Sequence, residues 1–177
     1  MRESYVAVKV PVSISAKWYK NFCDVFSINN RRRNFHITLA YCTNASAEEY
    51  EEMKKAVREI VESCNEITLV TQGIDVFLAQ NSNNYVIYLK TACIDDSFDI
   101  LKDKVRECVG SIAYKMEEFK MHITLLKKDR DSISIDELKK KLNEISVPLF
   151  DLELTEVYHT YARSQRLPEP WRLQTRD

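Results

Sequence analysis

The tetrapeptide His36-Ile37-Thr38-Leu39 recurs in the second half of the 177-residue chain as His122-Ile123-Thr124-Leu125. Each copy lies in a short run rich in aliphatic and aromatic residues, which is typical of a β-strand. If residue types occurred independently, a second histidine followed by the same three residues would arise by chance about once in several thousand cases. The repeat therefore indicates an internal duplication.

The order of elements around the two tetrapeptides is also repeated. A helix with a capping box, Ser46-Ala47-Glu48-Glu49 or Ser134-Ile135-Asp136-Glu137, follows each copy, and a strand, a loop and another strand come next. Residue periodicity predicts the remaining elements. Strands are expected at residues 5–10, 35–41, 67–78, 85–89, 119–127, 149–161 and 171–176. Helices are expected at residues 15–26, 46–64, 95–108 and 134–145.

The length of the chain fits one compact domain that needs neither a disulfide nor a metal for stability. Together with the duplication, it predicts an α+β fold with a single bilobal domain over residues 1–177. The first lobe would cover about residues 1–92 and the second about residues 93–177, related by a pseudo-twofold axis.

The composition is that of an ordinary globular protein, with 45% apolar and 30% charged residues. No apolar run is long enough to span a membrane, and the N-terminus has no signal-peptide core. The net charge of −1 argues against a general nucleic-acid coat but permits a small nucleotide in a locally basic cleft. The five cysteines form no Cys-x-x-Cys pair and are expected to be free thiols in a reducing compartment, the cytoplasm or the nucleus.

Side chains alternate between the two faces of a strand, so His36 shares a face with Thr38, and His122 shares a face with Thr124. The isoleucine and the leucine of each copy point to the other face, where they can be buried. If the lobes pack about a pseudo-twofold axis, two imidazoles and two hydroxyls converge on one groove.

Two imidazoles and two hydroxyls suit the cleavage of a phosphodiester. One imidazole can act as the general base for water or a ribose hydroxyl, and the other, as the imidazolium, can protonate the departing oxygen. Threonine hydroxyls can donate hydrogen bonds to the non-bridging phosphate oxygens. This chemistry needs no metal or other cofactor, and the sequence has no cluster of carboxylates and histidines that suggests a metal site.

The paired His-x-Thr-aliphatic motifs resemble those of the two-histidine phosphoesterase superfamily. The resemblance spans nearly the whole chain and includes Gly73-Ile74-Asp75-Val76-Phe77, which is similar to the strand between the two motifs in that family. It implies a bilobal α+β fold with two antiparallel-rich sheets around a central groove. It also implies that His36 and His122 are the acid–base pair and that Thr38 and Thr124 bind phosphate.

Members of this superfamily include LigT-like RNA 2′,3′-cyclic phosphodiesterases, 2′,5′-phosphodiesterases, and viral enzymes that destroy nucleotide second messengers. The resemblance, the compact chain and the lack of a long basic track favour a metal-independent phosphodiesterase of 2′-linked small oligonucleotide signals. The substrate would be 2′,5′-oligoadenylate or a cyclic dinucleotide, with no membrane and no protein partner required. An RNA 2′,3′-cyclic phosphodiesterase in RNA end processing and a non-catalytic nucleotide-binding module are the alternatives.

Four further residues are candidates for contact with the substrate. Tyr5 and Lys9 lie on the strand face opposite the valines and could stack on or neutralise a nucleotide, although an ordinary surface pair explains them equally well. Tyr161 and Arg163 belong to an aromatic and basic segment suited to base stacking and phosphate contact, although local packing explains them slightly better. The third histidine, His159, lacks a threonine two places later and is expected to be non-catalytic.

Overall fold

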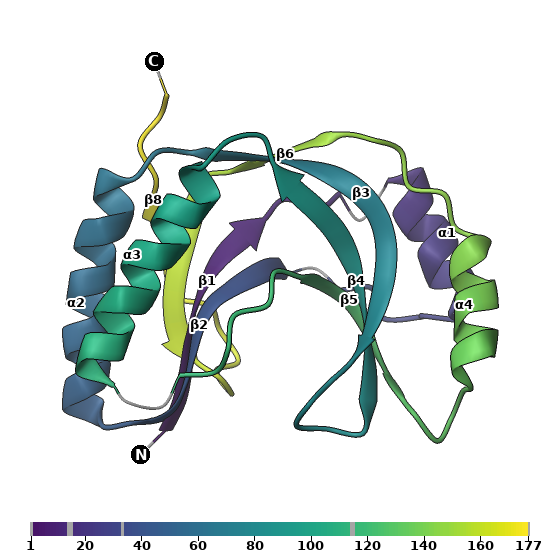
Figure 1. Ribbon diagram of the computed structural model, residues 1–177, viewed down its shortest axis with the longest axis horizontal. Helices are drawn as coiled ribbons and strands as arrows, with labels where there is room; N and C mark the ends of the chain where they lie inside the picture. Colours follow the sequence, from purple (N-terminus) through teal and green to yellow (C-terminus); the bar gives the residue numbers. More distant parts are fainter. Residues whose placement is uncertain (1, 14–15, 33, 114–115, 177) are drawn as a thin grey trace.

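The computed structural model describes residues 2–13, 16–32, 34–113 and 116–176 (Figure 1). Its strands are β1 (Arg2–Val10), β2 (Phe35–Ala45), β3 (Ile67–Leu78), β4 (Asn84–Cys93), β5 (Ile123–Asp129), β6 (Asp151–Leu154), β7 (Glu156–Tyr161) and β8 (Trp171–Arg172). Its helices are α1 (Lys17–Val25), α2 (Ala47–Ser63), α3 (Ser97–Ile112) and α4 (Ile135–Asn143). The expected start of the first helix, at residue 15, lies outside the described residues.

Both predicted serine caps begin helices. The Oγ of Ser46 accepts the backbone N–H of Glu49 (3.1 Å), and the Glu49 carboxylate accepts the N–H of Ser46 (2.7 Å). The Oγ of Ser134 likewise accepts the backbone N–H of Glu137 (3.2 Å). These bonds satisfy donors that the first turn of a helix leaves unpaired, which explains why the sequence located the starts of α2 and α4.

The strands form two four-stranded sheets in which every pair of neighbours is antiparallel. One sheet has the order β2-β1-β7-β8, and the other has the order β5-β4-β3-β6. The edge strands β2 and β5, which carry or adjoin the tetrapeptides, contact each other at the centre of the arch in Figure 1. The predicted α+β fold with antiparallel sheets is confirmed.

A pair of helices accompanies each sheet (Figure 1). α2 and α3 pack together beside β2 and β8. α1 and α4 lie together beside the other sheet, where the Nζ of Lys141 donates to the carbonyl of Val25 (3.4 Å). Each pair takes one helix from either half of the chain, so the duplicated units are interleaved in space.

The two sheets do not follow the expected division near residue 92. β7 and β8, from the second half, complete the sheet of β1 and β2, whereas β3 and β4, from the first half, pair with β5 and β6. The expected lobes of residues 1–92 and 93–177 therefore do not coincide with the sheets. Strand pairing depends on which backbone groups form hydrogen bonds with one another. It does not depend on where the sequence duplication begins.

The segment expected to be one strand over residues 149–161 is divided. β6 pairs with β3 and β7 pairs with β1, so the chain crosses from one sheet to the other at Thr155. The Thr155 carbonyl accepts the N–H of Leu173 (2.9 Å), so the residue between the two sheets is hydrogen-bonded to the segment that follows β8. The last strand is also shorter than expected: β8 has two residues, and Gln174 forms an isolated parallel bridge with Asn65.

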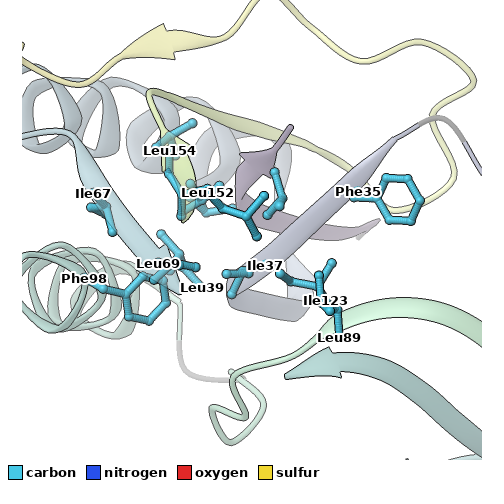
Figure 2. Packing of buried hydrophobic residues seen from close by; sticks show 14 of the residues in the cluster. Phe35, Ile37, Leu39, Ile67, Leu69, Leu89, Phe98, Ile123, Leu152 and Leu154 are labelled. Carbon is cyan, nitrogen blue, oxygen red and sulfur yellow. The ribbon is translucent and has the colours of Figure 1, made fainter. Parts of the chain in front are cut away.

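One hydrophobic core runs through both sheets and includes the aliphatic residues of both tetrapeptides. Ile37, Leu39 and Ile123 are fully buried, and Leu125 is 3% exposed. Figure 2 shows Ile37, Leu39 and Ile123 among other buried side chains of the cluster. Because burial of a side chain of this size contributes about 1.5–3 kcal/mol, the tetrapeptides anchor their strands from the inner side.

The cysteines are free, and three of them, Cys23, Cys42 and Cys64, are buried. Buried thiols pack as small apolar side chains. Within the part of the chain that the structure describes, no helix combines the length and the apolar character needed to cross a membrane.

Candidate active site

One side of the first sheet carries the polar residues of the first tetrapeptide. His36 pairs with Lys9 and Thr38 pairs with Ala7 in the β1–β2 ladder. Cross-strand partners project to the same side of a sheet, so all four share one face. His36 and Thr38 are half-buried on that face, whereas Ile37 is fully buried on the other.

The second tetrapeptide is placed in a similar way on the other sheet. Thr124 pairs with Tyr88, and β5 begins one residue after His122, so this histidine lies just before the strand expected at 119–127 and not within it. The Nδ1–H of His122 donates to the carbonyl of Lys120 (2.7 Å), since a carbonyl oxygen can only accept. This bond leaves Nε2 as the unprotonated nitrogen of the neutral ring.

A β-bulge follows the threonine of the first tetrapeptide. The partner of Thr38 is Ala7, but the partner of Val6, one residue earlier in β1, is Ala40. Leu39 is therefore an extra residue in β2, and the alternation of side chains shifts by one position after it.

A second bulge occupies the corresponding place in β5. Thr124 pairs with Tyr88, whereas the preceding residue of β4, Ile87, pairs with Leu126. Leu125 is therefore the extra residue, at the same place in its tetrapeptide as the bulge in β2. The duplication thus extends to an irregularity of the backbone.

The bulges bring the fifth residue after each histidine onto the polar face. Tyr41 pairs with Tyr5, and Lys127 pairs with Val86, which lies on the same side of β4 as the partner of Thr124. Without the bulges, alternation would turn both side chains toward the opposite side. We call the resulting surface the histidine face; it comprises Tyr5, Lys9, His36, Thr38, Tyr41, His122, Thr124 and Lys127.

The pKa of His36 is lowered to about 4. Burial is the largest cause, and the positive charges of Arg32, His122 and Lys127 act in the same direction. The imidazole also stacks against the ring of Tyr5, with 5.5 Å between the centroids. Because the charge of His122 acts on His36, the two imidazoles lie within electrostatic reach of each other.

The pKa of His122 is also lowered, mainly by burial, with the ammonium groups of Lys120 and Lys127 contributing. The hydrogen bond to the Lys120 carbonyl opposes the decrease, because that carbonyl stabilises the protonated ring. The imidazole and the ring of Phe77 form a T-shaped pair, with 5.3 Å between centroids and 83° between planes. His122 is therefore oriented by a carbonyl and by an aromatic ring.

A single guanidinium connects the two halves of the site. Arg106 on α3 donates from Nη1 to the carbonyl of Leu39 and from Nη2 to the carbonyl of Glu117, both at 2.9 Å. The N–H of Glu117 donates to the carbonyl of Tyr41 (3.1 Å). The segment that leads to His122 is therefore bonded to β2, which fixes the spacing between the two tetrapeptides.

Two of the four expected substrate contacts, Tyr5 and Lys9, share the histidine face. The ring of Tyr5 stacks on His36 and makes a T-shaped contact with Tyr158 at 6.0 Å, and the ring of Tyr158 also lies 6.4 Å from that of His36. The ammonium of Lys9 lies 3.4 Å from the carboxylate of Glu156. The charge of Lys9 is thus partly neutralised by Glu156, whereas the ring of Tyr5 lies beside the imidazole of His36.

The other two expected contacts lie elsewhere. Tyr161 pairs with the buried Ser4 on the opposite side of the sheet, where its ring stacks on Tyr50 with 4.1 Å between centroids. Its aromatic character is explained by this packing against α2. Arg163 lies beyond the end of β7, close enough to Tyr41 for its charge to act on that phenol.

Tyr41 and Lys127 are not among the residues that the sequence singled out for this face. Regular alternation after Thr124 would place Leu126 and Lys128 on the histidine face, and the bulge replaces them. The available signal was the consecutive apolar pair Leu125-Leu126, because two neighbouring leucines in a half-exposed strand both require burial.

The remaining histidine, His159, lies away from this face. It is 1% exposed, its Nε2 is 3.2 Å from the Oγ of Ser4, and its ring packs on Tyr50. Among the described residues, no group of three histidine, cysteine, aspartate or glutamate side chains is arranged to hold a metal ion.

Comparisons with known proteins identify the family and the fold. A model of the 2′-5′ RNA ligase superfamily matches residues 17–160. A comparison with curated proteins gives no match. Escherichia coli LigT complexed with 3′-AMP superimposes with a TM-score of 0.62 at 19% identity, over 97% of each chain. Usb1 of Kluyveromyces marxianus superimposes with a TM-score of 0.61 at 12% identity, over 97% of this chain and 98% of its own. At these identities the structural similarity concerns the fold.

Proposed function

The chain belongs to the 2′-5′ RNA ligase superfamily of two-histidine phosphoesterases, and from that premise we propose that it is a metal-independent phosphodiesterase of 2′-linked small oligonucleotide signals. One observation carries the proposal: an imidazole and a threonine hydroxyl from each tetrapeptide lie on the histidine face, with the charge of Lys127 acting on both imidazoles. The LigT and Usb1 structures that hold 3′-AMP and uridine monophosphate support a nucleotide substrate.

In the proposed mechanism, the phosphate lies between the imidazoles of His36 and His122. His36 removes the proton from the attacking hydroxyl or water, and His122 protonates the departing oxygen. This division follows from the surroundings of the two rings. Burial and neighbouring charges lower the pKa of His36 to about 4, which suits a group that begins neutral. The Lys120 carbonyl stabilises the protonated form of His122 and directs its Nε2 away from the backbone.

The hydroxyls of Thr38 and Thr124 would donate hydrogen bonds to the non-bridging oxygens of the phosphate. Negative charge on those oxygens grows as phosphorus becomes five-coordinate, so donors fixed by two sheets favour the transition state. The ammonium of Lys127 would add a positive charge on the same side, placed there by the bulge at Leu125.

The pH dependence should reveal the charge of Lys127. The productive state has one protonated and one neutral imidazole, and both pKa values lie below the ordinary value. We therefore expect kcat/KM to decline as the pH rises through a range below the ordinary imidazole pKa of about 6.5, where the acid loses its proton. Lys127→Met removes a charge that lowers both pKa values, so the declining limb should move to higher pH. The maximum of kcat/KM should also fall about tenfold, because the phosphate loses a cationic partner.

The matched control is Lys128→Met, which changes the net charge equally. Lys128 pairs with Tyr85 and projects from the other side of β5. Its substitution should leave both the position and the height of the pH profile close to those of the wild type. A declining limb that stays in place in the Lys127→Met variant would contradict the assigned role.

A substrate panel tests the proposed function itself. We expect the highest kcat/KM for 2′,5′-linked oligoadenylates or mixed-linkage cyclic dinucleotides, with 3′,5′-linked oligonucleotides much slower and exhaustive chelation without effect. A preference for 2′,3′-cyclic phosphates would assign the chain to RNA end processing instead. Tight binding without turnover of any compound would indicate a nucleotide-binding module.

A further inference from the structure

A cavity of about 640 Å³ lies at the end of β1 remote from Lys9, the ladder partner of His36. The cavity is large enough for a nucleotide unit. The chemistry proposed for the histidine face makes no use of it. Its lining includes Arg2, Glu3, Thr43, Asn44, Tyr161 and Arg163.

A row of aromatic rings connects the histidine face with this cavity. The ring of Tyr5 stacks on His36, and the ring of Tyr41 lies nearly parallel to that of Tyr5, with 6.3 Å between centroids and 9° between planes. The hydroxyl of Tyr41 donates to the carboxylate of Glu3 in the cavity wall (3.0 Å). Successive rings on one sheet face are the usual platform for the bases of a single strand, because every base has a π-face.

The cavity itself combines cationic and neutral polar groups. The guanidinium of Arg2 lies 5.3 Å from the centroid of Tyr161, and both residues line the cavity. Arg163 provides a second guanidinium, and one carboxylate, that of Glu3, is already engaged by Tyr41. The N–H of Ala162 donates to the carbonyl of Glu3 (3.0 Å), so the turn that carries Arg163 is bonded to β1. A guanidinium held on such a turn suits the geometry of a phosphate.

We propose that this cavity is a second binding site for the same substrate, which would therefore be a linear oligonucleotide running from His36 along Tyr5 and Tyr41 to Arg163. The inference rests on the proposed phosphodiesterase function. Glu3 lies six positions before Lys9 in β1, which corresponds to about 20 Å along a strand. A strand of about three to six nucleotides spans that distance, depending on its extension, whereas a cyclic mononucleotide or dinucleotide does not.

The test is a series of 2′,5′-linked oligoadenylates from the dimer to the hexamer. We expect kcat/KM of the wild-type protein to rise about tenfold or more from the dimer to the longest member, because additional phosphate and base contacts form. Arg163→Met should abolish most of this increase of kcat/KM with length. The control Arg58→Met changes the net charge equally on the exposed surface of α2 and should keep the wild-type ratio. Equal ratios in the wild type and Arg163→Met would overturn the proposal.

Binding without cleavage separates this proposal from the function on which it rests. The affinities of fluorescently labelled dimer and hexamer are measured by anisotropy with the His122→Ala protein. Tighter binding of the hexamer than of the dimer, lost when Arg163→Met is added, supports the cavity site. This holds even if the wild-type protein cleaves neither compound. In that case only the proposed phosphodiesterase activity fails. Equal affinities for dimer and hexamer would overturn the cavity site alone.

Discussion

Substitution of either tetrapeptide histidine, His36→Ala or His122→Ala, is expected to lower kcat by about 10³- to 10⁴-fold. Each imidazole moves a proton in the proposed reaction, and no other histidine lies on the histidine face. Because the two groups act as a unit, the double variant should lose little more than either single variant. Both rings are half-buried and neither belongs to the core cluster, so the melting temperature should change little.

The same two variants distinguish the acid from the base. A substrate with a nitrophenolate leaving group needs little protonation as it departs, so it should restore much of the activity of His122→Ala. His36→Ala should gain no comparable restoration, since its attacking group still lacks a base. The opposite pattern would reverse the two roles, and full activity of either variant on the natural linkage would eliminate the acid–base mechanism.

The third histidine provides the matched control. His159 is buried beneath α2, so His159→Ala should lower the melting temperature by about 5–10 °C through loss of packing. Its kcat per folded molecule should stay near that of the wild type at a temperature below the transition. The expected effects on stability and turnover are therefore opposite to those of the two tetrapeptide histidines.

The second large effect is expected for the threonine hydroxyls. Thr38→Val and Thr124→Val keep the shape of the side chain and remove the donor, and each should lower kcat by about 10²- to 10³-fold with a smaller change in KM. The reason is that the hydrogen bonds to the phosphate strengthen as charge develops on its oxygens, so their loss affects the transition state more than the bound substrate.

Thr68→Val is the control for this pair. The Oγ1 of Thr68 donates to Glu153 across the β3–β6 ladder at 2.8 Å, so the substitution also removes a strand hydroxyl that makes a hydrogen bond. Steady-state kinetics should show no loss of kcat. If Thr38→Val or Thr124→Val behaved like Thr68→Val, the hydroxyls would have no part in charge stabilisation.

The local features of the fold could be predicted from the sequence to a large extent. The serine caps at Ser46 and Ser134 identify helix starts because their hydrogen bonds join residues three positions apart. Alternation in a strand placed Ile37 and Ile123 in the core and their neighbouring polar residues on the other side. These inferences depend only on neighbouring residues, which explains their success.

The errors concern pairing between distant segments. Residues 149–161 have the composition of one strand, yet the chain changes sheets at Thr155 because β3 and β1 provide separate sets of backbone partners. Only the structure shows that the ring of Tyr161 stacks on Tyr50 of α2, and its expected contact with the substrate stays a prediction. In both cases the deciding partner lies far away in the sequence.

By itself, the sequence determined that the chain contains two related units, each with an imidazole and a hydroxyl on one face of a strand, because the repeat and the alternation are properties of neighbouring residues. Only the tertiary structure decided that β7 and β8 join the first sheet and that Leu39 and Leu125 form bulges. Those bulges bring Tyr41 and Lys127 onto the histidine face, where burial and neighbouring charges lower the pKa values of both imidazoles. Ladder register and electrostatic environment arise from segments that meet only when the chain is folded, so the residues of one strand do not specify them.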